Sequence, residues 1–364
     1  MSILTIQHFV QEVKQMETLH DPEVFLQHLQ YPAFFVKNGC ITAANTAAQQ
    51  RFAEVGAQIL PLLSTGKEDY AQLTEGTLYL TLQLCGTSYR CAVTVYEDCH
   101  LFRLEDVPAN STLQTLSLAA SQLSLPLSDL TILINKQEPL SNEEQNRLNQ
   151  QLHRLQRIIG NMADAADSVH HTPRMERCDL IAVLQELLEK SSHYLAQNQI
   201  ILDYQLPAQS VCTYADTEMI KRAVYNLLSN AAKFSTENKT ISVSASVTGS
   251  VFSLTVRNKC TALKQPAYAD FFRHYERQPG LEDPKNGLGL GMTLIHSAAA
   301  AHGGTVLITQ DQTGSMKFTF TVAIKSASDS FVRSPILRPD IYGGKDQALV
   351  ELSDVLPASL YANK

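Results

Sequence analysis

The sequence lacks a surplus of basic residues, a long apolar run and a clustered set of cysteines. Its 364 residues include 29 Lys and Arg against 36 Asp and Glu, for a net charge of −7. This balance implies no strongly basic face, so we do not expect nucleic acid as the main partner. Apolar runs such as Ala298–Ala301 fall far short of the roughly 20 residues that a bilayer demands. The sequence therefore predicts no transmembrane span.

The seven cysteines are odd in number and scattered, without a CxxC pair or a Cys/His cluster of metal-ligand spacing. Reduced thiols in a cytosolic protein are the simplest interpretation. The segment Met1–Thr5 is not a basic stretch leading into an apolar core, so we expect no signal peptide. We predict a cytoplasmic protein whose stimulus arrives inside the cell or through a partner protein.

The first hundred residues have the pattern of a small α/β domain. Asn38-Gly39 separates the runs Ala33–Val36 and Cys40–Ala43, which predicts a hairpin because both turn positions need positive φ. Further helices and strands are expected at Ile3–Val13, Pro22–Leu29, Thr77–Leu84, Ser88–Tyr96 and His100–Leu104. This order, together with Val36–Phe52, resembles a PAS sensor domain. An unrelated small α/β domain is the alternative, and no histidine or cysteine is placed to hold haem or flavin.

Apolar residues of the middle segment recur at alternating steps of three and four, which predicts a heptad seam on two helices. The seam comprises Leu113, Leu116, Ala120, Leu123, Leu127, Leu130 and Ile134, then Leu148, Leu152, Leu155, Ile159, Met162, Ala166 and Val169. A break at Pro139 separates the helices, and Ser141 with Glu144 forms a capping box. A lone hairpin cannot bury both stripes, so two copies should pair into a four-helix bundle. An intramolecular bundle is the alternative.

Helices and strands alternate again from about Arg177 to Lys325. We expect helices at Leu180–Gln197, from Asp216 to Phe234 and at Gly287–Ala301, and strands at Ile200–Leu206, Val211–Tyr214, Thr240–Val247, Val251–Arg257, Thr305–Thr309 and Lys317–Ile324. The tail from Ser326 ends in an expected short amphipathic helix, Ala348–Leu356. We expect the tail to be a docking or ordering segment, and its sequence indicates no chemistry.

Three polar residues share one face of the helix that follows Asp216. At 100° per residue, Asn226, Asn230 and Lys233 lie opposite its apolar residues. Taken alone, such a face is usually only solvated. The stretch NLLSNAAKFS, however, resembles the N box of the histidine-kinase ATPases, the GHKL superfamily that also includes gyrase-type ATPases. The resemblance implies that the Asn230 oxygen ligates Mg²⁺, that Asn226 supports this site, that Lys233 meets the phosphates of ATP and that Phe234 packs against the nucleotide.

A second motif, Asn286–Gly304 (NGLGLGMTLIHSAAAAHGG), contains three alternating glycines ahead of a helix. Backbone amides at Gly287, Gly289 and Gly291 can approach an anion closely, and the helix N-terminus favours negative charge. A lone GxGxG is equally typical of a flexible turn. Here it resembles the second glycine box of the same family, in which Leu290 also belongs to the ATP-binding residues.

Between the two boxes, Phe271–Arg277 (FFRHYER) resembles the aromatic box of the ATP lid. Phe272 and Tyr275 take the hydrophobic positions, and Arg277 takes the basic position near the phosphates. A core aromatic pair is the alternative. The resemblance extends over roughly Arg177 to Lys325.

The first glycine box of the family, Asp-x-Gly-x-Gly, stands here as Asn258-Lys-Cys260-Thr-Ala262. The resemblance implies that Asn258 accepts the hydrogen bond of the adenine amino group in place of aspartate. A charged acceptor contributes about 1.5–3 kcal/mol and a neutral one about 0.5–1.5 kcal/mol. The exchange should cost about 1 kcal/mol, and Cys260 and Ala262 would crowd the adenine. We therefore expect nucleotide binding that is several-fold weakened.

The first helix departs further from the family, which carries His-Glu-x-x-x-Pro there. Pro126 matches the proline, but Ser121 occupies the histidine position and Gln122 the glutamate position. A serine hydroxyl is a weak nucleophile without a neighbouring base, and glutamine cannot accept a proton. Leu125 replaces the residue that positions water for dephosphorylation of a response regulator. His153, on the second helix, is a poor candidate for the acceptor.

The sequence thus predicts an α+β multidomain protein. Its parts are a PAS-like sensor domain (1–107), a dimerisation hairpin (111–170), a GHKL-type α/β sandwich (175–325) and a tail (326–364). One hypothesis is a degenerate histidine kinase, or pseudokinase, that dimerises, binds ATP with Mg²⁺ and signals through a response regulator or another protein. A second is a working kinase that phosphorylates a partner on His or Ser. A third is an interaction module that never binds nucleotide.

Overall fold

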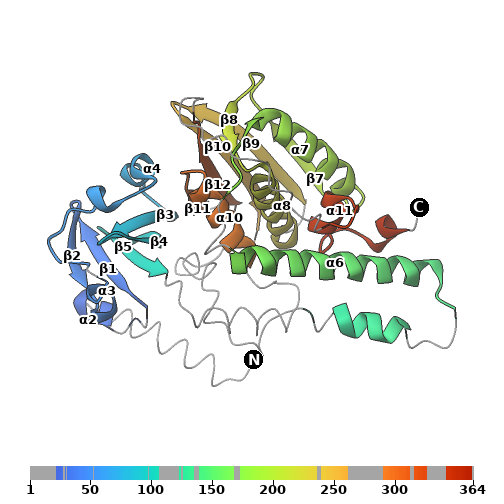
Figure 1. The fold of residues 1–364 in the computed structure, drawn as a ribbon, viewed down its shortest axis with the longest axis horizontal. Coiled ribbons are helices and arrows are strands. Elements are labelled where there is room, and N and C mark those ends of the chain that lie inside the picture. Colours follow the sequence, from blue (N-terminus) through green and yellow to red (C-terminus); the bar gives the residue numbers. More distant parts are fainter. Residues whose placement is uncertain are drawn as a thin grey trace. The chain divides into compact units, whose positions relative to one another are not determined.

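The computed structural model describes residues 22–27, 29, 31–51, 53–96, 98–105, 123, 126–134, 139–167, 173–235, 239–260, 290–311, 315–325 and 342–362. The chain forms two compact units, Met1–Pro108 and Ala109–Lys364 (Figure 1). Both mix helices with strands, which confirms the predicted α+β class. Within these ranges, every helix is too short or too polar to cross a membrane.

The first unit contains five antiparallel strands in the order β2-β1-β5-β4-β3. Their bounds are β1 Ala33–Lys37, β2 Cys40–Ala44, β3 Thr77–Leu84, β4 Thr87–Tyr96 and β5 Cys99–Glu105. Short helical segments lie between them: α2 Pro22–Gln27, α3 Thr46–Gln49, η1 Leu60–Leu62 and α4 Lys67–Ala71. The predicted strands agree with these bounds to within about a residue, because their apolar and β-branched content is a local signal. The helix expected at 3–13 lies outside the described residues.

The β1–β2 turn has the backbone that its two residues predict. Asn38 and Gly39 take φ values of 53° and 77°, as a two-residue hairpin requires. Asn45 then ties the hairpin to the preceding chain. Its Oδ1 accepts the backbone N–H of Ala33 at 3.0 Å, and its Nδ2 donates to Tyr31 O at 2.7 Å. The hairpin prediction is therefore confirmed, while the likeness to a PAS domain stays a prediction.

The second unit contains a sheet in the order β11-β12-β10-β9-β7, in which only the β7–β9 pair is parallel. The strands are β7 Ile201–Gln205, β9 Thr240–Thr248, β10 Val251–Lys259, β11 Val306–Gln310 and β12 Ser315–Ala323. Alternate residues of β10 are buried because side chains alternate between the two faces of a sheet. Helices α7 (Leu180–Ala196), α8 (Thr217–Phe234) and α10 (Leu290–Ala301) pack on this sheet (Figure 1).

Two strands form a separate small sheet beside these helices. β8 (Cys212–Ala215) pairs with β6 (Glu176–Asp179), and the backbone N–H of Val211 donates to Asp179 Oδ1 at 3.0 Å. Asp179 also caps α7, since its side chain accepts the N–H of Ile181. The sequence did not predict β6, because four residues with three charges carry no apolar alternation.

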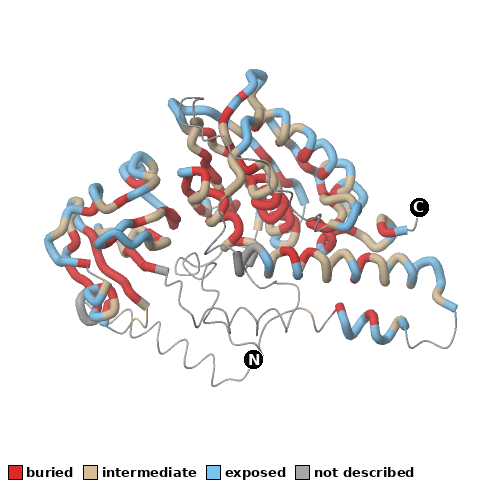
Figure 2. The backbone as a smooth tube through the Cα atoms, viewed as in Figure 1, coloured by how far each residue is buried: buried red, intermediate tan, exposed pale blue. Residues whose placement is uncertain are grey.

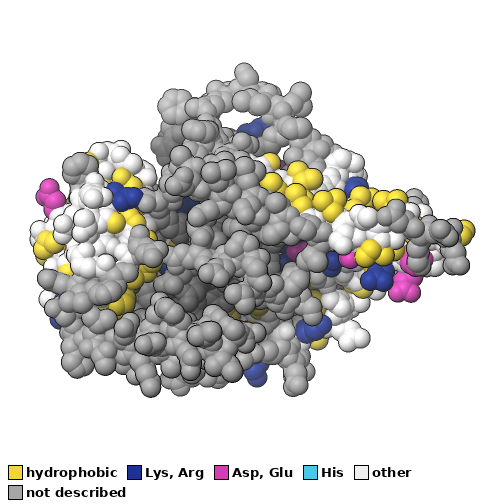
Figure 3. Space-filling view, turned by 90° about the horizontal axis from the view of Figure 1, so that it is seen from below, with side chains coloured by type: hydrophobic (Ala, Val, Ile, Leu, Met, Phe, Trp, Pro, Cys, Tyr) yellow, Lys and Arg dark blue, Asp and Glu magenta, His cyan; other side chains and the backbone are white. Residues whose placement is uncertain are grey.

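Helix α6 (Asn142–Asp167) starts at the predicted capping box. The backbone N–H of Ser141 donates to Glu144 Oε2 at 3.0 Å, and the N–H of Glu144 donates to Ser141 Oγ at 3.3 Å. This prediction is confirmed. On the seam, Leu152 and Ile159 are 41% and 58% exposed. Figure 3 shows apolar side chains open to solvent on the side where α6 lies. Residues 123 and 126–134 are also helical, and the rest of the first predicted helix lies outside the described residues.

The C-terminal segment, by which we mean residues 342–361, lies against α6, α7 and α8 (Figure 1). It contains α11 (Gln347–Glu351) and the 3₁₀ turn η4 (Ala358–Tyr361). Asp346 caps α11 by accepting the N–H of Ala348 at 2.8 Å. The expected helix was well placed but too long, because the chain turns after Glu351. The segment buries apolar side chains against the rest of the second unit: Ala348, Val350, Leu352, Val355, Leu356 and Tyr361.

Candidate functional site

Helix α8 carries the predicted N box and begins at Asp216, whose Oδ1 accepts the N–H of Met219 at 3.2 Å. The face that bears Asn226 is not solvated. Arg222, Asn226 and Ser229 are 5%, 1% and 0% exposed, and Figure 2 shows most of α8 as buried. Burial on α8 thus extends beyond the apolar face to Asn226, which excludes the interpretation that its polar face is merely solvated. Polar partners from α6, α10 and the C-terminal segment cover this face as well.

The N box and the second glycine box meet at Asn226 and Gly291. A Cβ atom on Gly291 would lie 2.7 Å from Asn226 Oδ1, closer than side-chain carbons approach such an atom. Any larger residue at position 291 would force the Asn226 side chain to move. One turn along α8, Asn230 Nδ2 lies 3.4 Å from Met292 Sδ. The structure therefore brings together the two motifs that the sequence placed in one site.

Lys233 does not face open solvent, since its side chain is 15% exposed. Its Nζ donates to Asp354 Oδ2 at 2.6 Å, and Arg157 Nη1 donates to the same oxygen at 2.5 Å. Burial alone would raise the pKa of the Asp354 carboxyl. The charges of Lys233 and Arg157 outweigh this effect and hold the pKa well below its usual range. The carboxylate therefore stays ionised at neutral pH.

Arg157 of α6 joins this site, although no motif indicated it. Its Nη2 lies 3.3 Å from Asn226 Oδ1 and 3.2 Å from Ser229 Oγ, and its Nε is 3.7 Å from Glu351 Oε2. The apolar seam of α6 predicted a role in dimerisation and drew no attention to its basic residues. A signal was present nonetheless, because Arg154 and Arg157 both lie off that seam and form a basic face.

Asn258, at the end of β10, is 3% exposed. Its Nδ2 has no hydrogen-bond partner among the described residues. A buried amide donor without a partner is costly, and such atoms often mark the position of a ligand or water. Cys260, two residues further along, is only half-buried, and burial raises the pKa of its thiol. The residue proposed to contact the base is thus enclosed and has hydrogen-bonding capacity left.

Several predicted site residues lie outside the described residues, so their roles stay predictions. They are Ser121, Gln122, Leu125, Ala262, Phe272, Tyr275, Arg277, Gly287 and Gly289. Leu290 is the first residue of α10, but its side chain is not described. His153 is described, and its Nδ1 donates to Asn149 O at 2.7 Å while its ring packs edge-on against Tyr361. This position, under the C-terminal segment, does not favour a role as phosphoacceptor.

Among the residues that the structure describes, no group of three or more His, Cys, Asp and Glu side chains is arranged to hold a metal ion. A magnesium ion bound with ATP does not need such a group. Mg²⁺ commonly takes one or two protein ligands, with phosphate oxygens and water completing its octahedron. Asn230 lies one turn from Asn226, with its Nδ2 beside Met292 of α10.

His302 ties the end of α10 to the start of α8. The backbone N–H of Asp216 donates to His302 Nε2 at 2.9 Å, and His302 Nδ1 donates to Ala298 O at 2.6 Å. One ring nitrogen therefore accepts and the other donates, which requires the neutral imidazole. Burial lowers the pKa of His302, in agreement with this arrangement.

Acid should therefore destabilise the second unit. Because the folded pKa of His302 lies below the unfolded value of 6.5, the unfolded state binds more protons at low pH. The stability that the neutral ring supports is present above pH 6.5 and falls as the pH drops towards the folded pKa. Urea unfolding at several pH values between about 7.5 and 5 measures this loss. His302→Gln should show a smaller pH dependence, and equal pH dependence in both proteins would contradict the assignment.

Residues 215–326 match the family described as "Histidine kinase-, DNA gyrase B-, and HSP90-like ATPase". The sensor histidine kinase CusS of Escherichia coli O6:H1 is 33% identical over 100 residues, which cover 27% of this chain and 21% of CusS. The sensor protein KdpD of Clostridium acetobutylicum is 24% identical over 141 residues, covering 38% of this chain and 15% of KdpD. The chain thus spans about a fifth or less of the length of these relatives.

Solved structures give weaker likenesses. Histidine kinase ThkA in complex with response regulator protein TrrA has a TM-score of 0.45 at 15% identity, over 84% of this chain and 99% of that chain. Acinetobacter baumannii histidine kinase AdeS has a TM-score of 0.45 at 18% identity, over 56% and 96%. Structural similarity of this degree adds no argument to the family match at residues 215–326.

Proposed function

We propose, from the premise that residues 215–326 are an ATPase domain of the histidine kinase-like family, that this chain is a cytoplasmic signalling protein that binds ATP with Mg²⁺. The observation that carries the proposal is the contact of the N box with the second glycine box. Asn226 and Gly291 approach so closely that a Cβ atom at position 291 would displace the Asn226 side chain. A glycine backbone and two amides at one helix face are the groups that a magnesium-bound triphosphate requires.

In this proposal each described site residue has one task. Asn230 ligates Mg²⁺, Asn226 supports the site, and Lys233 binds phosphate. Phe234, which is 38% exposed, packs against the nucleotide. Arg277, Gly287, Gly289 and Leu290 complete the lid and the glycine box, as the resemblance implies.

Asn258 supports adenine as the base. Its unpartnered Nδ2 can donate to the ring nitrogen N1 while its Oδ1 accepts from the exocyclic amino group. This pair of hydrogen bonds offsets part of the cost of replacing a charged acceptor by a neutral one. The donor would otherwise remain buried and unpaired, at a cost of about 1–3 kcal/mol.

We further propose that the protein is a degenerate kinase. Ser121 and Gln122 stand where the family carries the phosphoacceptor histidine and its glutamate, and His153 is held by Asn149 and Tyr361. Signalling would then depend on conformation or on holding a partner, such as a response regulator. The exposed seam residues Leu152 and Ile159 favour a homodimer, since an apolar stripe of this kind is stable only when covered.

A competing function is that of an active kinase, which would phosphorylate a partner on His or Ser. It keeps the positioning residues of phosphoryl transfer but needs an acceptor from another protein. Incubation of the purified protein with labelled ATP distinguishes the degenerate kinase from the active kinase. A stable, acid-labile and base-resistant phosphoprotein would exclude the degenerate kinase, whereas transfer to a partner that Asn230→Ala abolishes would establish the trans reaction.

Asn230→Ala tests nucleotide binding directly. Removing one Mg²⁺ ligand should weaken binding of MgATP about 10- to 100-fold, because a polar contact to a charged group is lost. Calorimetric titration of the full chain measures the affinity. Asn142→Ala, which removes an exposed amide at the start of α6, should leave the affinity unchanged. No heat of binding from wild-type protein at millimolar MgATP or MgADP would instead favour the nucleotide-independent interaction module.

A further inference from the structure

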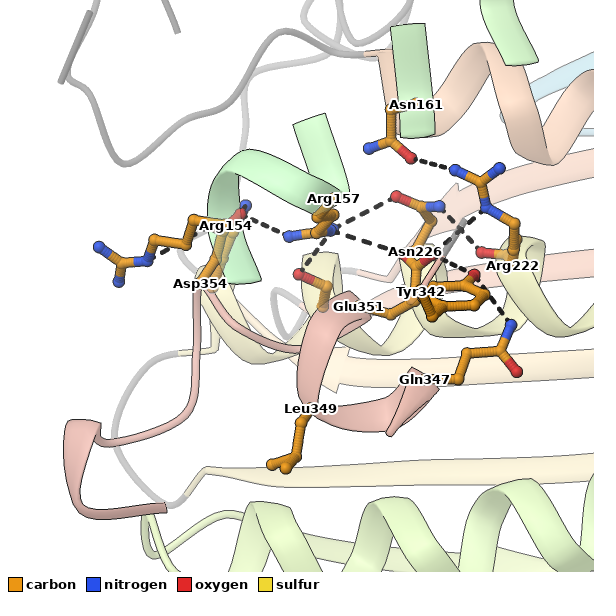
Figure 4. A network of polar contacts seen from close by, with 12 residues as sticks. Arg154, Arg157, Asn161, Arg222, Asn226, Tyr342, Gln347, Leu349, Glu351 and Asp354 are labelled. Atoms are coloured by element: carbon orange, nitrogen blue, oxygen red, sulfur yellow. Dashed lines mark hydrogen bonds and ion pairs between the residues drawn. The ribbon is translucent and has the colours of Figure 1, made fainter. Parts of the chain in front are cut away.

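The Asp354 carboxylate lies where two cations from different helices converge, and Figure 4 shows one of them, Arg157, beside it. Lys233 of α8 and Arg157 of α6 both donate to its Oδ2, at 2.6 and 2.5 Å. A third cation, Arg154, has its Nε 3.7 Å from Oδ1. Convergent Lys and Arg donors on one oxygen form the typical environment of a bound phosphate.

This anion position belongs to the N box and not to a remote surface. Arg157, which binds the carboxylate with Nη1, also reaches Asn226 Oδ1 and Ser229 Oγ with Nη2. Asn226 in turn contacts Gly291. The Asp354 carboxylate and Asn226 therefore contact the same Arg157 side chain. The anion position lies next to the residues that bind Mg²⁺ and phosphate in the proposed function.

Asp354 reaches this position because the C-terminal segment is held on α6 by its backbone. Gln150 Nε2 donates to Ser353 O at 3.1 Å and to Leu356 O at 2.7 Å, on either side of Asp354. Asn149 Nδ2 donates to Tyr361 O at 2.9 Å. The carboxylate is thus presented by an ordered segment, yet its side chain remains 32% exposed and open to exchange with solvent anions.

We propose that Lys233 and Arg157 form a phosphate subsite of the nucleotide site, and that Asp354 occupies this subsite until a nucleotide phosphate displaces it. The inference rests on the proposed function, since it takes the ligand to be ATP. It adds Arg157, a residue of α6, to the phosphate-binding groups. It also makes the C-terminal segment a competitor of the nucleotide, because two anions cannot share one pair of cations without strong repulsion.

Competition of this kind lowers the apparent affinity in proportion to the fraction of molecules whose subsite is open. Asp354→Asn keeps the size of the side chain but removes its charge, so the subsite should open. We expect the full chain with Asp354→Asn to bind MgATP about tenfold more tightly than wild type in calorimetric titration. Adenosine, which has no phosphate, should bind both proteins equally.

Asp346→Asn is the matched control, because Asp346 is an acidic residue of the same segment that pairs with Lys190 of α7. It should leave the MgATP affinity unchanged. If Asp346→Asn tightened binding as much as Asp354→Asn, general loosening of the segment would be the cause, and the subsite would be excluded. If Asp354→Asn also tightened the binding of adenosine, phosphate competition would be excluded.

Arg157→Gln tests the second cation. In the Asp354→Asn background it should weaken MgATP about tenfold and leave adenosine unaffected, as expected for the loss of one charged contact. Circular dichroism checks that each variant is folded, and Asp354→Ser replaces Asp354→Asn if the latter is not.

Hydrogen exchange gives a readout that does not depend on variants. MgATP should speed exchange of the 347–356 amides in wild-type protein, and unchanged or slower exchange would overturn the displacement. If neither wild type nor Asp354→Asn binds MgATP, both the proposed function and this inference are excluded. Equal MgATP affinity of wild type and Asp354→Asn would remove the inference alone.

Discussion

Glu351→Ala is expected to release the C-terminal segment, at a cost of about 3 kcal/mol or more. Glu351 is 1% exposed and lies between two guanidinium groups (Figure 4). Its Oε1 is 3.3 Å from Arg222 Nε, and its Oε2 is 3.7 Å from Arg157 Nε. Removing one partner of a buried ion pair leaves the remaining buried charge less well compensated.

The remaining contacts limit the loss but do not remove it. In the variant, Arg157 still forms its ion pair with Asp354. Arg222 still donates from Nη2 to Asn161 Oδ1 at 2.9 Å. Tyr342, however, loses one hydrogen bond as well, since its Oη donates to Glu351 Oε1 at 2.9 Å. We therefore place the effect at the lower end of the usual range of about 3–5 kcal/mol.

Hydrogen exchange of the segment measures the effect. The N–H groups of Val350 and Leu352 are bonded to Asp346 O and Ala348 O, so they report on α11. Exchange at these amides should become roughly 100-fold faster or more, the equivalent of about 3 kcal/mol. Glu176→Ala is the control, because Glu176 forms an exposed pair with Arg174 that contributes about 1 kcal/mol at most. Equal protection in both variants would contradict the account of Glu351.

Gly304→Ala is expected to prevent normal packing of the second unit. A Cβ atom at this position would lie 1.8 Å from the backbone oxygen of Thr321 and 2.4 Å from its carbonyl carbon. The clash is with the backbone of β12, which cannot rotate away as a side chain would. Thr321 is also fixed by its pairing with Thr305, whose O accepts the Thr321 N–H at 2.9 Å.

The expected loss of unfolding free energy exceeds the usual overpacking cost of about 1–3 kcal/mol. Urea unfolding followed by circular dichroism measures it. Gly303→Ala separates the clash from the loss of glycine as such. Gly303 has a φ of +69°, and a Cβ there would lie 3.4 Å from that of Ala323, so only the left-handed backbone disfavours alanine. This control should lose about 1–2 kcal/mol. Equal losses in the two variants would disprove the close approach at Gly304.

Local signals predicted most of the described elements. The Asn38-Gly39 turn, the Ser141 capping box and the span of α8 each depend on residues within a few positions of one another. The same holds for the strands, whose observed bounds differ from the predicted ones by one or two residues at most ends. β6 was missed because its four residues form a strand only through their partner β8, which supplies the hydrogen bonds.

The candidate site was predicted in part. The sequence identified Asn226, Asn230, Lys233 and Gly291 as one site, and the structure brings them together. It did not predict that Arg157 of α6 contacts Asn226 or that Asp354 of the tail pairs with Lys233. These contacts join distant residues, since Lys233 and Asp354 are 121 positions apart in the chain.

The sequence by itself determined the order of helices and strands, the two ATPase motifs and the absence of a histidine at position 121. Only the tertiary structure decided that α6 and the C-terminal segment close over the N box, and that Asp354 satisfies the cations there. Helix and turn signals depend on residues close together in the sequence, so the sequence alone is enough to predict these elements. Ion pairs such as Arg157–Asp354, 197 positions apart, exist only once the hydrophobic core has brought the helices together.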